Sequence, residues 1–295
     1  MSVERNLTPR QLALATGVSE SSIKRWCDAG EIATIRTPGG HRRIPLSGAM
    51  QFLRKAEHEL KQPELLGLPV ATRPGALTPE QAREQLASGL AAGDEVHCRQ
   101  VLFELYLHQC PLSVIGDEVI SPAFVAIGHG WETGDVEIFQ ERRAFELTRN
   151  LLHELRMAQP SPSLHAPVAL GGAAAGDNYA LAPILVELVL RECGWRAEFL
   201  GTDLPMRTLT SAITQRQPRL AWLSVSHIED EAAFLQEYAL LHESTGEPTA
   251  LVVGGRALHA DLRRQMAYSA YCETLQQLAA YSQSLAAASA SETSA

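Results

Sequence analysis

The chain has 295 residues, of which 45% are hydrophobic, enough for two or three folded domains. Its five cysteines lie far apart and form no CxxC or Cys/His ligand pattern, which argues against a disulfide framework and a structural zinc site. No apolar run approaches the roughly 18 residues of a membrane span, and the N-terminus lacks the order of a signal peptide. We therefore expect a protein of the reducing cytoplasm, with no membrane partner, metal ligands or catalytic residues.

The net charge of −9 is unevenly distributed. Residues 1–55 contain nine Lys or Arg and four Asp or Glu, whereas the remaining residues contain 16 basic and 30 acidic side chains. An acidic body repels a phosphate backbone, and a small basic module attracts it. The asymmetry favours a nucleic-acid-binding segment at the N-terminus, joined to a body with another task.

The first 61 residues have the pattern of short helices followed by a hairpin. A Thr-Pro pair starts a helix over residues 9–15, and a second helix is expected from Ser19, with polar and basic side chains away from its buried face. Residues 32–35 and 41–44 are expected to form two strands joined by a Pro-Gly-Gly turn. A helix follows to about residue 61. These elements predict a winged helix-turn-helix domain over residues 1–61.

Short polar and basic side chains on the second helix and on the wing suit a protein that reads DNA. A helix in the major groove turns such side chains toward base edges, and arginines on a wing pair with phosphates. A solvated basic face on a protein-binding module is the other interpretation of the same charges. The expected DNA-binding residues are Ser21, Ser22, Lys24, Arg25, Arg36, His41, Arg42 and Arg43.

The segment from Arg36 to Arg43, RTPGGHRR, resembles the winged-helix signature of the MerR family of transcription regulators. The resemblance covers about the first 60 residues and implies double-stranded operator DNA as the partner. One winged helix makes too few contacts for tight, specific binding, so two or more heads on repeated or palindromic half-sites are expected. This arrangement predicts a homo-oligomer, either a dimer or a tetramer.

Beyond the head, the sequence indicates two further domains. Residues 62–76 are rich in proline and glycine and are expected to be a linker, and four helices follow that predict a bundle over 77–159. From 160 to 285, short apolar β runs alternate with helices, which predicts a doubly wound, flavodoxin-like parallel α/β domain. The low-complexity tail 286–295 is expected to be disordered. The helices of the bundle are expected at about 79–92, 94–110, 112–129 and 136–158, and the strands at about 168–170, 197–200, 220–225, 250–253 and 268–270.

A bundle joined to a flavodoxin-like domain resembles the cobalamin-binding module of cobalamin-dependent methionine synthase. The order of all three domains resembles the light-responsive MerR repressors of the CarA, CarH and LitR type, over nearly the full chain. In that family Trp, nine residues and then Glu-His cover the upper face of the corrin, and here Trp131 is followed by Glu141 and Arg142. The resemblance implies that these three residues lie at the upper face, with the histidine replaced. A plain core or helix-end aromatic is the other interpretation of Trp131.

The lower cobalt ligand of that family is the histidine of an Asp/Glu-x-His-x-x-Gly motif. This sequence keeps Asp177 but has Tyr179 at the ligand position and Ala182 in place of the glycine. A phenol with a pKa of about 10 stays neutral at pH 7 and is a poorer cobalt ligand than imidazole. Histidine-ligated cobalamin is therefore not expected at Tyr179.

Other parts of the family's pocket are kept. The resemblance places Ser224 and Ser226 along the nucleotide tail of the cofactor, and Gly254 and Gly255 where the tail approaches the backbone, although tight turns after strands also require glycine. Three outcomes are compatible with these motifs. The body binds cobalamin without the histidine, or it binds another planar ligand such as a tyrosine-ligated haem, or it is cofactor-free and serves oligomerisation.

These observations predict a DNA-binding transcriptional regulator that acts as a repressor and is not an enzyme. Its body is a cobalamin-type sensing or oligomerisation module that works without cobalamin, or one that answers to light or ligand through an atypically bound tetrapyrrole. Two interpretations of other classes stay open: a subunit of a cobalamin-dependent methyltransferase or mutase, and an antirepressor that binds another regulator. The first gives the basic head no role, and the basic segment 36–43 argues against the second.

Overall fold

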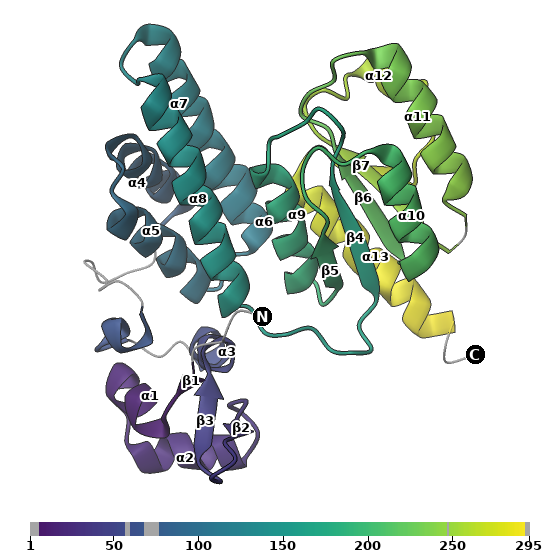
Figure 1. Ribbon diagram of the computed structural model, residues 1–295. Helices are drawn as coiled ribbons and strands as arrows, with labels where there is room; N and C mark the ends of the chain where they lie inside the picture. Colours follow the sequence, from purple (N-terminus) through teal and green to yellow (C-terminus); the bar gives the residue numbers. More distant parts are fainter. Residues whose placement is uncertain (1–5, 57–59, 68–76, 247, 293–295) are drawn as a thin grey trace. The chain divides into compact units, whose positions relative to one another are not determined.

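The computed structural model of the protein describes residues 6–56, 60–67, 77–246 and 248–292 (Figure 1). It divides into two units, Met1–Ser161 and Pro162–Ala295. The first unit contains a small α/β head and a helical bundle, and the second is a parallel α/β sheet covered by helices. The multidomain α and α/β fold expected from the sequence is confirmed.

The head is a winged helix-turn-helix. Strand β3 pairs antiparallel with β1 on one side and with β2 on the other. Both expected helix starts are confirmed, because Thr8 forms a capping box with Gln11, and Ser19 accepts a hydrogen bond from the backbone N–H of Ser22 at 3.1 Å. The first wing strand, expected from residue 32, begins only at Ile35. The elements are β1 (Asn6–Leu7), α1 (Pro9–Thr16), α2 (Glu20–Asp28), β2 (Ile35–Arg36), β3 (Arg42–Pro45) and α3 (Leu46–Ala56).

The segment expected to be a linker, 62–76, begins inside the packing of the head. A short 3-10 helix, η1 (Pro63–Leu66), packs on α1 with its first and last residues buried. The backbone N–H groups of Lys61 and Gln62 donate to the carbonyl of Ala15 at 2.8 and 3.1 Å. The proline that suggested a linker thus opens a helical turn, a position that suits its fixed φ. The later part of the expected linker, 68–76, lies outside the described residues.

The bundle contains the four helices expected from the sequence. The third of them is interrupted, because the π-helical turn η2 lies just before Pro122, which cannot donate a backbone hydrogen bond. The stretch Leu112–Thr133 is long and apolar enough to cross a membrane by length and composition alone. Its buried residues pack in the bundle, as a core helix also would. The elements are α4 (Pro79–Ala92), α5 (Glu95–Leu107), α6 (Leu112–Val114), η2 (Ile115–Ile120), α7 (Ser121–Thr133) and α8 (Ile138–Ala158).

The second unit has a five-stranded parallel sheet in the order β5-β4-β6-β7-β8. This is the flavodoxin-like order, in which the strand order reverses between β4 and β6 and ligands bind beyond the carboxyl ends of the strands. Helices α10 and α11 cover one face through a core cluster that includes Leu209, Leu223 and Leu241. On the other face, α9 packs on β4, β5 and β6. The elements are β4 (Val168–Ala173), α9 (Leu181–Glu192), β5 (Arg196–Phe199), α10 (Met206–Arg216), β6 (Leu220–Ser224), α11 (Glu231–Ser244), β7 (Ala250–Gly254), α12 (Ala260–Arg263) and β8 (Ala270–Tyr271).

A last helix, α13 (Leu275–Glu292), corrects the expectation of a disordered tail from residue 286. The helix packs on α9, with Leu278 and Ser282 buried. Alanine has the highest helix propensity of all residues, so an Ala/Ser-rich segment continues a helix that packing has already started. Residues 293–295 lie outside the described part of the chain.

Candidate nucleic-acid interface and ligand edge

Helix α2 presents a polar and basic face to solvent. Ile23 and Cys27 are buried in the head, whereas Ser21, Lys24 and Arg25 on other faces are exposed. Ser22 is half-buried, and its hydroxyl lies 2.9 Å from that of Ser19. The ion pair between Lys24 and Glu20, at 2.8 Å, is exposed and costs little to break when a phosphate approaches. The helix therefore offers the side chains that a major groove accepts.

The wing is a hairpin closed by a tight turn. The N–H of Gly40 donates to the carbonyl of Thr37 at 2.8 Å, and Gly40 has a left-handed φ of 77°. A turn followed by a glycine in this conformation matches the twist of an antiparallel pair of strands. Arg36 and His41 flank the turn and are exposed, and Arg43 on β3 is half-buried. The turn thus places two arginines and a histidine on one hairpin.

Arg42 is a predicted DNA-binding residue of the wing whose side chain bonds to α2. Its guanidinium forms an ion pair with Asp28 and donates to the carbonyl of Lys24 at 3.1 Å. Only 22% of its side chain is exposed. Both partners belong to α2, so Arg42 ties the wing to the recognition helix. No local pattern predicts this contact, since its partners are remote along the chain.

In the bundle, the residues predicted to cover a corrin lie on α7 and α8. Trp131 is 50% exposed, Arg142 is exposed and Glu141 is half-buried. Ile138 and Phe139 at the start of α8 are also exposed. The last turn of α7 and the first turns of α8 therefore carry an accessible apolar surface, and Trp131 is not a core aromatic of the first unit.

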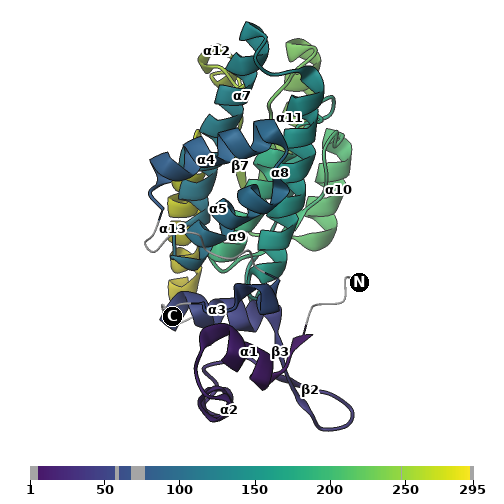
Figure 2. The same cartoon turned by 90° about the vertical axis from the view of Figure 1, so that its left-hand side faces the viewer.

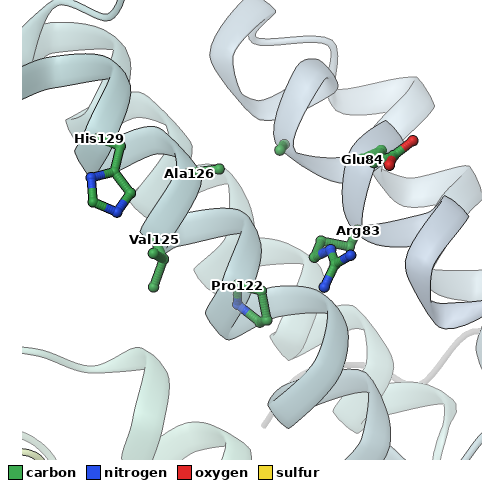
Figure 3. Close-up of a pocket in the computed structure, with 7 residues that line it drawn as sticks. Arg83, Glu84, Pro122, Val125, Ala126 and His129 are labelled. Carbon is green, nitrogen blue, oxygen red and sulfur yellow. The ribbon is translucent and has the colours of Figure 1, made fainter. Parts of the chain in front are cut away.

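A shallow groove of about 450 Å³ lies elsewhere on the bundle, between α4 and α7 (Figure 3). Arg83 and Glu84 come from α4, and Val125 and His129 come from α7. None of the three predicted corrin-facing residues lines this groove. The groove is therefore distinct from the surface that carries Trp131.

At the carboxyl edge of the sheet, Asp177 connects three loops. Its carboxylate accepts hydrogen bonds from the backbone N–H groups of Tyr179, at 2.9 Å, and Ser226. Its own carbonyl accepts from the N–H of Asp203 at 3.0 Å, and the Asp203 carboxylate in turn accepts from Gly176 at 2.7 Å. Asp177 is only 1% exposed. The buried Asp177 carboxylate thus joins the loops after β4 and β6, and its backbone carbonyl, together with the Asp203 carboxylate, joins the loop after β5.

Replacing Asp177 with Ala is expected to lower the free energy of unfolding by about 2–4 kcal/mol, because two N–H groups lose their acceptor in a buried place. Asp177→Asn keeps one acceptor oxygen, so its free energy of unfolding should lie between those of the wild type and Asp177→Ala. Urea unfolding followed by tryptophan fluorescence and circular dichroism measures the change. Asn178→Ala, at an exposed neighbour, is the control and should change stability by less than about 0.5 kcal/mol. Equal stability of the Asp177→Ala and Asn178→Ala variants would show that the carboxylate does not hold the loops.

The other residues predicted at this edge are close to Asp177 or to the neighbouring strand. Tyr179 is 37% exposed, and Ser224 is buried at the end of β6. The carbonyl of Gly254 accepts from the N–H of Val225 at 2.8 Å. A Cβ on Gly254 would lie 2.6 Å from the carbonyl oxygen of Cys272, so the packing of the strands itself excludes a side chain there. Arg256, which the sequence did not single out, donates to the carbonyl of Ser226 at 3.3 Å.

Trp222, in the middle of β6, is a second residue that the sequence did not single out. Ala221 and Leu223 belong to the core cluster under α10 and α11, so strand alternation directs Trp222 to the opposite face, the face of Ser224. The indole is 2% exposed, and a Cβ on Gly171 of β4 would lie 2.6 Å from it. Within the described structure, the indole N–H has no hydrogen-bond partner. A large side chain therefore covers Gly171 on one face of the sheet, at the pair of strands β4 and β6 where the strand order reverses.

These features do not fit a cobalamin that histidine ligates from below. The ligand position carries a phenol, and the Asp177 carboxylate is occupied by backbone N–H groups. Trp222 lies on the sheet face on which the resemblance places the nucleotide tail. The edge keeps the loop geometry of a cofactor-binding fold but lacks the nitrogen donor at the ligand position.

Comparisons with known proteins agree with this organisation. Residues 7–56 match a helix-turn-helix domain, and residues 82–156 match a B12 binding domain. The chain is 27% identical over 284 residues to the HTH-type transcriptional repressor CarA and 25% identical over 295 residues to the HTH-type transcriptional repressor CarH, both of Myxococcus xanthus. Each alignment covers 92% of this chain and 94% of the relative. The monomethylamine corrinoid protein of Methanosarcina barkeri has a similar fold, with a TM-score of 0.59 and 15% identity over 70% of this chain and 100% of that chain.

The winged head and the two-part body define a DNA-binding transcription regulator with a cobalamin-binding-like body. Among such regulators, the chain is similar to the repressors CarA and CarH over most of its length.

Proposed function

We propose that this protein is a cytoplasmic transcriptional repressor that binds double-stranded operator DNA through α2 and the wing. The observation that carries the proposal is the exposed set of polar and basic side chains on these two elements, which are joined by the contact of Arg42 with Asp28. Ser21, Lys24 and Arg25 suit a major groove, and Arg36, His41 and Arg43 suit the adjacent phosphates. The similarity to two repressors over most of the chain supports this role.

The repressor acts as a dimer or tetramer in this proposal. A single head offers few contacts to bases and phosphates, so specific binding needs a second head at a linked half-site. The remaining 240 residues, which carry an excess of acidic side chains, contribute little to DNA affinity and are suited to hold the heads together.

The body works without cobalamin in this proposal. Three features support a body whose loops are held by its own side chains. The ligand position carries Tyr179, the Asp177 carboxylate accepts hydrogen bonds from two backbone N–H groups, and the indole of Trp222 is buried. Cobalamin bound in another mode, and a different tetrapyrrole such as haem, are the alternatives that the experiment below distinguishes.

The protein is not an enzyme in this proposal. Burial raises the pKa of the Cys98 thiol to about 12 and that of Cys272 to about 11, and it also raises the pKa of Cys27 and Cys193. A thiol with a raised pKa is protonated at pH 7 and is a poor nucleophile. These cysteines are therefore packing residues.

The test combines operator binding with cofactor uptake. Footprinting on the promoter of the protein's own gene is expected to show a protected site with repeated or palindromic half-sites. The purified protein is also incubated with adenosylcobalamin in the dark, or with haem, and then desalted and passed through size-exclusion chromatography. We expect a colourless protein of unchanged oligomeric state that still binds DNA.

Other outcomes of this experiment are informative. Retained corrin absorbance with a light-reversible change of oligomer would overturn the proposal that the body works without cobalamin. Retained haem absorbance would identify haem as its ligand. Tyr179→His is the companion variant: absorbance retained by this variant alone would show that only the donor atom has been lost. No protected site on any promoter fragment would contradict the proposed role as an operator-binding repressor.

A further inference from the structure

Helix α3 links the DNA-reading elements of the head to the bundle. Toward the head, the ring of Phe52 packs on the indole of Trp26 in α2, with ring centroids 5.1 Å apart. Toward the bundle, α3 contacts α5 and α8. Figure 2 shows α3 between the bundle on one side and α1 and α2 on the other. The recognition helix therefore reaches the bundle through one intervening helix.

The contact between α3 and the bundle includes an arginine and a tyrosine. The guanidinium carbon of Arg54 lies 4.0 Å from the centroid of the Tyr106 ring in α5. Tyr106 is fully buried, and its hydroxyl donates to the carbonyl of Ala158 in α8 at 3.5 Å. Phe103 packs edge-on against the same ring, with centroids 6.5 Å apart. Two helices and a second aromatic thus fix the ring, and a cation over a fixed aromatic face is a directional contact.

Resting on the proposed function as an operator-binding oligomer, we infer that Arg54 and Tyr106 are positioning residues that fix the orientation of the head on the bundle. They thereby determine which spacing of half-sites the oligomer accepts. Heads on a flexible tether tolerate many spacings, whereas heads held on a rigid body accept few. In Figures 1 and 2, α2 and the β2–β3 hairpin lie on the side of the head away from α5 and α8, so the attached head leaves its DNA-binding residues accessible.

The attachment is separable from the folding of the head. Phe52, the residue of α3 that packs on the recognition helix, is buried and lies two residues from Arg54, so the two side chains leave different faces of the helix, and Arg54 is half-buried. The chain beyond α3 returns to α1, where Pro63 and Leu66 are buried. Removing the Arg54 side chain therefore leaves the contacts inside the head in place.

Hydrogen–deuterium exchange on the full chain tests the attachment directly. Arg54→Ala is expected to speed exchange in the last turns of α3 and α5 by at least about threefold, because local opening becomes easier where a contact is lost. Lys55→Ala is the matched control: it removes a cation from the same last helical turn, but Lys55 is exposed. Tyr106→Phe keeps the aromatic face but loses the hydrogen bond to Ala158, so exchange should become faster where α5 meets α8 and stay unchanged in α3. Unchanged exchange in Arg54→Ala would overturn the attachment.

Operator binding tests the consequence for spacing. The DNAs are a single half-site, the native operator and an operator lengthened by about five base pairs, which rotates one half-site by half a turn. We expect Arg54→Ala to bind the single half-site like the wild type. Its preference for the native spacing over the lengthened operator should be at least about tenfold smaller than that of the wild type, whereas Lys55→Ala should keep the wild-type preference. An undiminished preference in Arg54→Ala would overturn the positioning role. A wild-type protein that binds none of these DNAs would refute the proposed function, and the exchange experiment would still decide the attachment.

Discussion

Replacing Arg25 or Arg43 with Ala is expected to weaken operator binding about 10- to 100-fold without changing the oligomeric state. Each arginine that reaches a base edge or a phosphate contributes about 1–3 kcal/mol, and an oligomer loses the contact in every engaged head. Arg25 is exposed on α2, and Arg43 lies on β3 beside the wing turn. A mobility-shift titration at several salt concentrations measures the effect, and the slope of affinity against salt should fall by about one for each phosphate contact that is lost.

Arg207→Ala is the control for the loss of one positive charge, because Arg207 is exposed on α10 in the second unit. Its affinity and salt slope should equal those of the wild type. Size-exclusion chromatography of each variant separates a loss of contacts from a loss of assembly. If Arg25→Ala and Arg43→Ala both bind the operator as the wild type does, the assignment of the DNA-binding surface to α2 and the wing is wrong.

Much of the fold could be predicted because local chemistry sets the start of each element. Thr8 and Ser19 begin helices because their side chains accept the first free N–H groups, and Gly40 ends the wing turn because it tolerates a left-handed φ. In the second unit, β-branched and other apolar runs separated by amphipathic helices are typical of a parallel sheet. These signals are each contained within a few neighbouring residues.

The part of the fold and of the candidate site that could not be predicted depends on contacts between distant segments. Nothing local distinguishes Arg42 from Arg43, yet only Arg42 forms an ion pair with Asp28. Asp177 was expected from a motif, but one of the two N–H groups that its carboxylate binds, that of Ser226, lies in a loop that the sequence alone does not bring close to it. Trp222 reads as one apolar residue among several in a strand, and only the pairing of β4 with β6 places its indole against Gly171.

The structure gives Gly255 two reasons to be glycine that do not involve a ligand. Its φ is 118°, and a Cβ would lie 2.3 Å from the carbonyl oxygen of Val225 and 2.7 Å from its nitrogen. The obstructing atoms belong to the backbone at the end of β6, so they cannot move aside as a flexible side chain would. Gly255→Ala should therefore lower the free energy of unfolding by more than about 3 kcal/mol.

Gly176→Ala separates the two effects. Gly176 lies at the same edge with a φ of 77°, but a Cβ there would meet nothing within 4 Å. This control carries only the conformational cost of about 1–2 kcal/mol. Urea unfolding of both variants in the absence of any cofactor gives the comparison, and equal losses would show that the clash at Val225 is relieved. A glycine kept only to let a ligand approach would tolerate a methyl group when no ligand is bound. A much larger loss at Gly255 would therefore mean that the fold itself requires this glycine, and that its presence is not a sign of a retained cobalamin site.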